Sequence, residues 1–437
     1  MIVVDAKALP TRAKLHREPV IPAGYVMTIQ TNNAVSGLLE RLTWLMRAID
    51  DDVSEFVQQY AQHWWTGFAS RTDASNAVAA PVGAWLLVAL ASGATATRRC
   101  TALGLQPERA EHIAAALLER APKALRAATA VWIASDQRTI AFDDWQQHLP
   151  PAVACGPVPT SQQADAWAHA ATDGLISRFP VAVTRETALV LVNALAADVR
   201  WRRPYLARPS DDWGVGRRWA GRVQSVLVGD DLTAVRTDQG LFAVHQAQAE
   251  GLIVLCVTGI PESAGMAAAA EVARAYLGGA SEDLWSLPLG EQGCWQIAEE
   301  PLEDAPAERV LRTEARVPAW EAESTWDLMA EPELGFVDAA QRISVLLADP
   351  GPAQAVQCAR ARFDRLGFTA SAVTALAIMR SAPPRDREPK AGVLRKVRVD
   401  FAEPFAAFAF VDEPDSPWHH VMAFAAWVAE PTEPTQV

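Results

Sequence analysis

The sequence predicts an α+β fold, because helical patterns fill roughly its first third and strand patterns dominate from residue 188 onward. Of the 437 residues, 50% are hydrophobic and 21% are charged, so the chain can bury a large core. The regular alternation of strand and helix that marks a parallel sheet is missing, and no linker or repeat divides the chain. We therefore expect one α+β domain.

Three segments of the first part carry helical patterns. Asn32–Ile49 places its leucines on one face, and Pro107–Trp132 is rich in helix formers. Asn76–Thr97 is uncharged and approaches the ~20 residues of a membrane-spanning helix, but it contains Pro81 and Gly83. We expect it to form a buried helix in a soluble core, and we expect no membrane partner.

Strand patterns follow from residue 188. Turns rich in Gly, Asp and Asn separate four apolar runs, "ALVLVNALAADVRW", "GRVQSVLVG", "LTAVRTDQGLFAVHQ" and "GLIVLCVTG". One helical run, "AGMAAAAEVARAYL", interrupts the strands that follow. Two last runs, "VRVDFAEPFAAFAFV" and "WHHVMAFAAWVAEP", flank "DEPDSP" and predict a closing hairpin.

Composition excludes several function classes. The net charge of −13 argues against nucleic acid as a partner, because phosphate binding needs a basic surface. The start of the sequence lacks the pattern of a secretory signal, so we expect a cytoplasmic protein. The cysteines are scattered and lack metal-ligand spacing, so we expect no metal site. P-loop, HExxH and GxSxG motifs are also missing, so we expect no cofactor and no enzyme. His419 and His420 are adjacent in a strand-like run, so we expect them on opposite faces.

One segment combines the composition of a strand with the ending of an exposed loop. From Gly367 to Thr374, small and β-branched residues nearly alternate, and in an extended chain Phe368, Ala370, Ala372 and Thr374 share one face. Prolines and basic residues follow up to residue 400, which is typical of an exposed loop open to proteases. A solvated surface loop on an acidic protein is the plainer alternative.

This segment resembles the hinge and reactive-centre loop of the serpins, in which a glycine precedes a run of small residues ending in threonine. The match is carried by Gly367, Ala370, Ala372 and Thr374. Further blocks occur in the family's order between about Asn32 and Pro431: "NAVAAPVGAWLLVALASGATAT", "ADAWAHAATDGLI", "LVLVNALAADVRWRRPY", "RVPAWEAESTWDL" and the tail from Phe401. The chain is similar to a divergent, bacterial-type serpin along almost its whole length.

The resemblance implies one serpin-like domain over residues 1–437, with an arm over 1–31 and the hinge and reactive loop over 367–400. It implies three β-sheets, about eight or nine helices and an exposed loop. It also implies a suicide-substrate inhibitor, expected as a monomer, in which a protease cuts the loop and the freed strand enters the central sheet. The partner would be a serine protease.

The resemblance also assigns roles to residues. By the family's spacing, the cut bond is Arg380–Ser381 or Ser381–Ala382, and "RSAPP" favours the first, which would suit a trypsin-like protease. The hinge comprises Gly367, Phe368, Thr369, Ala370, Ala372 and Thr374. The region where the sheet opens comprises Asn193, Trp201, Ala319, Gln357 and Arg365.

Four of these positions depart from the family's pattern. Phe368 replaces Thr or Ser, and a ring that enters the sheet there would cost ~1–3 kcal/mol if no room is made for it. Arg365 and Ala319 replace the glutamate and lysine of an ion pair, and Gln357 replaces a histidine. Two alternatives to inhibition therefore stay open: a non-inhibitory serpin-fold binding or chaperone-like protein, and an unrelated α+β enzyme.

Overall fold

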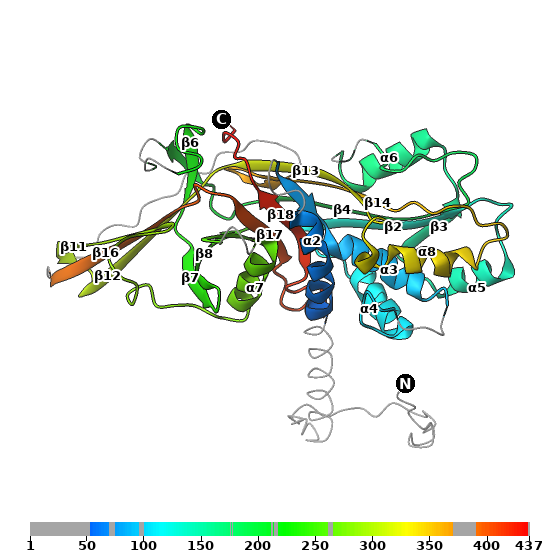
Figure 1. The fold of residues 1–437 in the computed structure, drawn as a ribbon, viewed down its shortest axis with the longest axis horizontal. Coiled ribbons are helices and arrows are strands. Elements are labelled where there is room, and N and C mark those ends of the chain that lie inside the picture. The colour runs from blue at the N-terminus through cyan, green and yellow to red at the C-terminus, as the bar shows by residue number, and fades with distance from the viewer. Residues whose placement is uncertain are drawn as a thin grey trace, which may run out of the picture. The chain divides into compact units, whose positions relative to one another are not determined.

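Three six-stranded β-sheets organise the computed structural model (Figure 1). It describes residues 53–69, 75–95, 100–174, 176, 178–210, 213, 217–260, 265–369 and 390–435. All of these belong to the unit Ala48–Val437, so the arm expected over 1–31 and the helix expected over 32–49 lie outside the described residues. The predicted α+β class and the three expected sheets are confirmed.

Sheet 1 is antiparallel throughout and forms the most deeply buried layer. In spatial order its strands are β1 (Ala77–Ala79), β18 (Met422–Val428), β17 (Phe405–Val411), β9 (Leu252–Thr258), β8 (Gly240–Gln248) and β7 (Leu232–Thr237). Every residue of β9, β17 and β18 is buried. β17 pairs with β18, which confirms the predicted closing hairpin.

The prediction for the two adjacent histidines was wrong. His419 and His420 lie in the turn before β18, and His420 has a φ of 58°. This left-handed residue brings both rings to one side, where they stack with centroids 3.8 Å apart. The alternation of faces holds only for extended residues.

Sheet 2 contains residues 390–400, which were expected in the exposed loop; this part of the prediction was wrong, because these residues form the strand β16. In spatial order its strands are β10 (Gly290–Gln292), β11 (Trp295–Ala305), β16 (Lys390–Asp400), β12 (Arg309–Val317), β6 (Ser225–Gly229) and β5 (Leu206–Pro209). β16 pairs antiparallel with β11 and parallel with β12, so it is held along both edges. In Figure 1 these three strands run together away from the helices.

Sheet 3 contains Asn193 and Gln357, and the other residues expected where the sheet opens, Trp201, Ala319 and Arg365, lie next to the ends of its strands. In spatial order its strands are β13 (Trp320–Asp327), β14 (Val356–Phe363), β15 (Gly367–Thr369), β4 (Leu189–Arg200), β2 (Leu125–Ile133) and β3 (Val153–Pro157). The segment of β2 was predicted as part of a helix because of its alanines. Pairing with β4 and β3 on both edges overrides that local preference.

Helices cover both faces of sheet 3. Those with both ends in the described residues are α2 (Trp65–Ala69), α3 (Pro81–Ser92), α4 (Pro107–Glu119), α5 (Ile140–His148), α6 (Ser161–Ala171), α7 (Gly265–Leu277) and α8 (Phe336–Ser344), with short 3₁₀ turns η2 (Gln62–Trp64) and η3 (Pro332–Leu334). Residues 53–61 are helical too. α6 lies on one face, whereas α3, α4, α5 and α8 lie on the other (Figure 1).

α3 is the buried helix that the sequence predicts, although residues 77–79 before it form β1. Nearly all of its side chains are buried, and Trp85 has no exposed surface. Pro81 stands in its first turn, where its missing N–H costs no helical hydrogen bond. No described helix is both long enough and apolar enough to cross a bilayer.

The buried position of α3 makes Trp85 a test of the core. We expect Trp85→Ala to lower the free energy of unfolding by about 3–5 kcal/mol, because the lost ring leaves a cavity. Ile140→Ala is the control, since Ile140 is 82% exposed and its loss should stay within about 0.5 kcal/mol. Urea unfolding measures both, and similar losses in the two variants would contradict this description of the core.

Candidate functional site

Strands β4 and β14 lie in the same sheet but do not pair with each other in the described residues. Only the short β15 lies between them, antiparallel to both. Its register matches Gly367 with Arg200 and Phe368 with Val199 on β4. Beyond β15, residues 189–197 of β4 and 356–362 of β14 face each other with no described strand between them. We call this gap the slot.

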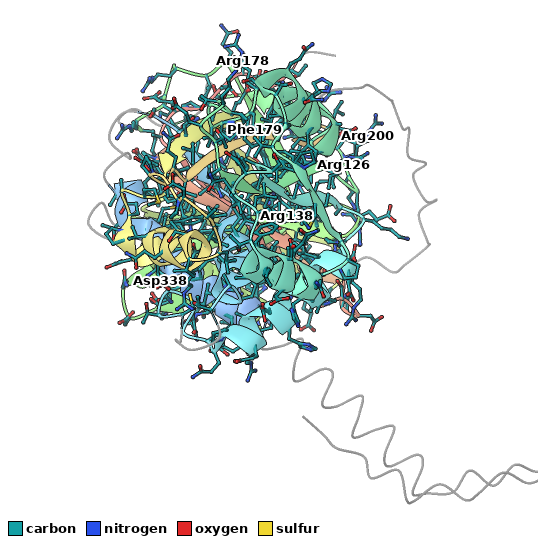
Figure 2. All side chains as sticks on the ribbon, turned by 90° about the vertical axis from the view of Figure 1, so that its right-hand side faces the viewer. Arg126, Arg138, Arg178, Phe179, Arg200 and Asp338 are labelled. Atoms are coloured by element: carbon teal, nitrogen blue, oxygen red, sulfur yellow. The ribbon has the colours of Figure 1, made fainter. Side chains whose placement is uncertain are left out.

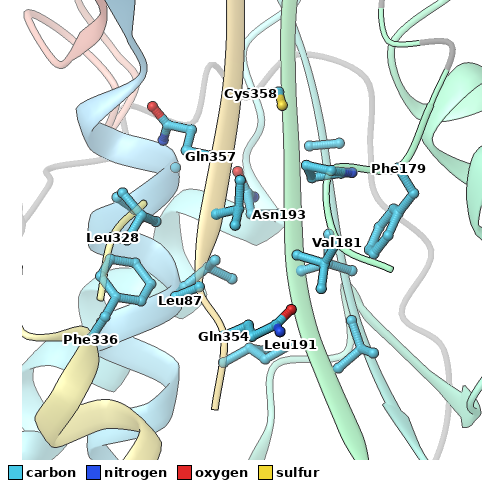
Figure 3. Close-up of a pocket in the computed structure, with 18 of the residues that line it drawn as sticks. Leu87, Phe179, Val181, Leu191, Asn193, Leu328, Phe336, Gln354, Gln357 and Cys358 are labelled. Atoms are coloured by element: carbon cyan, nitrogen blue, oxygen red, sulfur yellow. The ribbon is translucent and has the colours of Figure 1, made fainter. Parts of the chain in front are cut away.

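The slot opens into a cavity of about 550 Å³. Phe368 of β15 and Leu87 of α3 are among the residues that line it. Figure 3 shows Leu191 and Asn193 on β4 and Gln357 on β14, the two strands that border it. Because neighbouring strands lie ~4.8 Å apart, β4 and β14 are separated by about two strand spacings where β15 pairs with both.

Gly367 occupies a position that only glycine fits. A Cβ atom there would lie 2.2 Å from the carbonyl oxygen of Val199, closer than any real Cβ contact. The backbone of β15 can therefore approach β4 closely enough to pair only without a side chain at 367. This gives a structural reason for a glycine at the position where the resemblance places the start of a hinge.

The Phe368 ring lies in an aromatic pocket behind sheet 3. It is 4% exposed, and its centroid lies 6.3 Å from Trp320 and 6.0 Å from Phe424 of β18. The sequence suggested that a ring here would need extra room. The pocket provides that room because it is formed by residues from β13 and β18, far from 368 in the chain.

At the top of the slot, Trp201 fastens the turn between β14 and β15 to β4. Its indole N–H donates to the carbonyl of Asp364 at 2.8 Å, and its backbone N–H donates to Leu366 at 3.0 Å. The backbone N–H of Tyr205 donates to the carbonyl of Arg365 at 2.9 Å. Ala319 lies at the start of β13, where its carbonyl accepts from the N–H of Thr432 at 2.7 Å.

Asn193 and Gln357 line opposite sides of the slot, each with its own anchor. The Asn193 Nδ2 donates to Thr129 Oγ1 of β2 at 2.9 Å. Gln357 accepts from the Ala80 N–H at 2.8 Å and donates to the Ala80 carbonyl at 3.0 Å, beside the start of α3. Asn193 Oδ1 has no partner among the described residues. The two halves of sheet 3 can therefore separate without breaking a bond between these side chains.

α6, which lies alone on its face of sheet 3 among the helices named above, is attached to β2 and so to one side of the slot. Trp132 of β2 packs against Trp167 of α6 at 5.2 Å and against Phe179 at 5.8 Å between ring centroids. Arg126 of β2 pairs with Asp173 just after α6 at 2.7 Å. Figure 2 shows Arg126 and Phe179 on the end of the unit that carries α6.

The expected loop connects two different sheets. The described chain leaves sheet 3 at β15 and returns in sheet 2 at β16. Arg395 of β16 is buried and pairs with Glu299 at 2.7 Å, and Lys396 pairs with Glu300 at 2.6 Å. Ala370, Ala372, Thr374, Arg380 and Ser381 lie between these strands and outside the described residues.

Solved structures of serpins are similar to this structure. Cleaved Serpin 42Da matches with a TM-score of 0.58 at 15% identity, over 89% of this chain and 99% of that one. The thermophilic serpin Tengpin, in its native state, gives 0.57 at 13% identity over 87% and 94%. Human thyroxine-binding globulin in complex with thyroxine gives 0.56 at 15% over 88% and 100%. The chain has the serpin fold. No model of a known protein family and no curated protein matches its sequence.

The serpin fold was predictable from ordered motifs, but several residues of this site were not. Asp364 and Thr435 were not predicted from the sequence, and Phe424, which belongs to the tail motif of the resemblance, was not predicted to contact Phe368. Thr435 and Phe424 lie in segments distant from residue 368 in the chain. A local signal existed for Asp364 alone. Asp at the first and Gly at the fourth position of "DRLG" is typical of a tight turn, and the Asp364 N–H indeed donates to the Gly367 carbonyl at 3.1 Å.

A buried histidine supports the top of the slot of this serpin-fold protein. His245 is 1% exposed, and its Nε2 lies 2.6 Å from the Tyr205 hydroxyl. Its Nδ1 lies 2.7 Å from the carbonyl of Asp231, which can only accept, so Nδ1 carries the proton and Nε2 accepts from Tyr205. Burial lowers the pKa of His245 from 6.5 to about 4, because the charged ring would lose its hydration.

The low pKa of His245 makes stability depend on pH. The unfolded chain binds this proton near pH 6.5 and the folded protein only near pH 4, so stability falls as pH drops between those values. We expect this group to contribute a loss of about 3 kcal/mol over that range. His245→Gln keeps an acceptor and a donor and should lack this contribution. Urea unfolding at pH 7 and 4.5 tests it, and an equal fall in both proteins would contradict it.

Proposed function

We propose that this serpin-fold protein inhibits a trypsin-like serine protease by a suicide-substrate mechanism. The observation that carries the proposal is the slot, which already contains the first residues of the hinge as β15. A chain that continues from Thr369 in the same direction would run between β4 and β14. The loop itself is therefore the natural occupant of the slot.

The strands β15 and β16, which flank the loop, explain why the loop must be cut before it can insert. β15 is fixed in sheet 3, and β16 is hydrogen-bonded along both edges in sheet 2. An intact loop could enter the slot fully only by pulling β16 out of its sheet. Cutting at Arg380–Ser381 would free the hinge side of the loop while β16 keeps its place.

The chemistry of capture follows that of serine proteases. The serine hydroxyl attacks the carbonyl carbon of Arg380, an ester to Arg380 forms, and the bond to the nitrogen of Ser381 breaks as that nitrogen takes up a proton. Insertion then carries the esterified Arg380 away with the strand. Hydrolysis of the ester competes with insertion, so the rate of insertion decides whether the protease stays bound.

Insertion is favourable because it replaces solvated backbone with a paired strand. Each new ladder hydrogen bond contributes about 0.5–1.5 kcal/mol, and apolar side chains are buried at the same time. The lining of the slot, with Leu191 and Ala361 among its residues, suits small apolar side chains such as Ala370 and Ala372. The cytoplasm as its location and a monomer as its state are parts of the same proposal.

A second function is favoured by the packing of Phe368. Its ring is already buried between Trp320 and Phe424, which ties the start of the hinge in place and leaves the rest of the slot without a described strand. A non-inhibitory binding or chaperone-like protein could use the same fold, and thyroxine-binding globulin is a serpin-fold protein solved with a small ligand. Such a protein would be cut in the loop without trapping the protease.

Incubation with trypsin separates the two functions. We expect a covalent adduct that survives SDS gel electrophoresis, because insertion outruns hydrolysis of the ester. Arg380→Ala should abolish the adduct, whereas Arg385→Ala, a matched basic residue of the same loop, should leave it intact. Cutting of the loop with no adduct at any ratio of protein to trypsin would reject inhibition in favour of the second function.

A further inference from the structure

A buried carboxylate lies at the turn that leads into the hinge. Asp364 follows β14 directly and is 8% exposed. Its backbone N–H closes the turn onto the Gly367 carbonyl at 3.1 Å, and its Oδ1 accepts from the Arg365 N–H at 2.7 Å. The side chain thus stabilises the turn in which its own backbone takes part. Burying a carboxylate is costly unless charged and polar donors surround it.

Two residues outside the turn supply those donors. Arg362 Nη2 donates to Asp364 Oδ2 at 2.7 Å. The backbone N–H of Thr435 donates to Asp364 Oδ1 at 3.1 Å, and the Thr435 hydroxyl donates to Asp364 Oδ2. Arg362 also donates to the Thr435 hydroxyl, so the three side chains form a closed set. We call this set the clasp.

The segment that carries Thr435 is fastened at two more points. Thr432 donates its N–H to the Ala319 carbonyl at 2.7 Å, beside the start of β13. The Glu433 carboxylate accepts from the N–H groups of Gln224 and Ser225, at 2.6 and 3.3 Å, where β6 of sheet 2 begins. Thr435 is therefore held in place independently of Asp364, and it can fix the position of the hinge turn relative to the rest of the fold.

We propose that Asp364 is a positioning residue for the hinge and that Arg362 and Thr435 complete its site. The clasp holds the turn 364–366 in the tight form that directs Gly367 into pairing with β4. Arg365 and Ala319 stand where the sequence resemblance places an ion pair. The clasp instead ties the turn after β14 to the segment that carries Thr435, and Thr432 of that segment donates its N–H to the Ala319 carbonyl. The importance of the clasp for inhibition rests on the proposed function, whereas its effect on the hinge does not.

Amide hydrogen exchange on the uncut protein, without any protease, tests the clasp. We expect exchange in residues 364–369 to quicken about tenfold or more in Asp364→Asn, because hydrogen bonds to a charged group are lost. Thr435→Val removes the hydroxyl alone and should give a smaller increase. Thr432→Val is the matched control, since Thr432 contacts Ala319 through its backbone N–H, and this substitution should leave exchange unchanged.

Residues 405–411 of β17 serve as the internal reference. If the clasp positions the hinge, their exchange stays constant while that of 364–369 rises. Unchanged exchange at 364–369 in both Asp364→Asn and Thr435→Val would overturn the proposal, and so would an equal rise in β17, which marks general destabilisation. If Asp364→Asn does not fold, Thr435→Val decides alone. A missing trypsin adduct would reject inhibition and leave this result standing.

Discussion

The open pairing between β4 and β14 is the constraint on which the rest of this structure depends. Both strands have a full partner on their outer edges, β2 and β13, but among the described residues only the three-residue β15 joins their inner edges. Buried or half-buried strand edges are costly when their polar groups lack partners. One more strand between β4 and β14 would give hydrogen-bond partners to the backbone groups on both inner edges.

The surroundings of the slot fit that constraint. Asn193 and Gln357 are bonded to separate partners, Thr129 and Ala80, so neither bridges the gap. The cover formed by α6 is attached to β2 through Trp132 and Arg126. At the upper end, Trp201 holds the hinge turn against β4. Among the described residues, the slot is thus closed at β15 and holds no strand below it, and under the proposed function strand entry proceeds from that end.

The sequence was sufficient for the fold and for the short strand that begins at Gly367, because those features have local or ordered signals. Alternation after Gly367 predicts a strand, and the structure gives three residues of one. The room around Phe368 could not be predicted, because it is made by Trp320 and Phe424 from other sheets and strands. Asp364 and Thr435 lie 71 residues apart, and no pattern in either segment relates them. The cut bond and the remaining hinge residues stay predictions, since they lie outside the described residues.

The melting temperature of the protein before and after its loop is cut tests the central claim most directly, namely that the fold leaves one strand position in sheet 3 to be filled. A strand placed beside residues 189–197 would gain ladder hydrogen bonds on both edges, in total on the order of 10 kcal/mol. We therefore expect the cut protein, freed of protease, to melt at least about 10 °C higher than the intact protein. An unchanged or lower melting temperature, with the cut located in residues 370–389, would contradict the account.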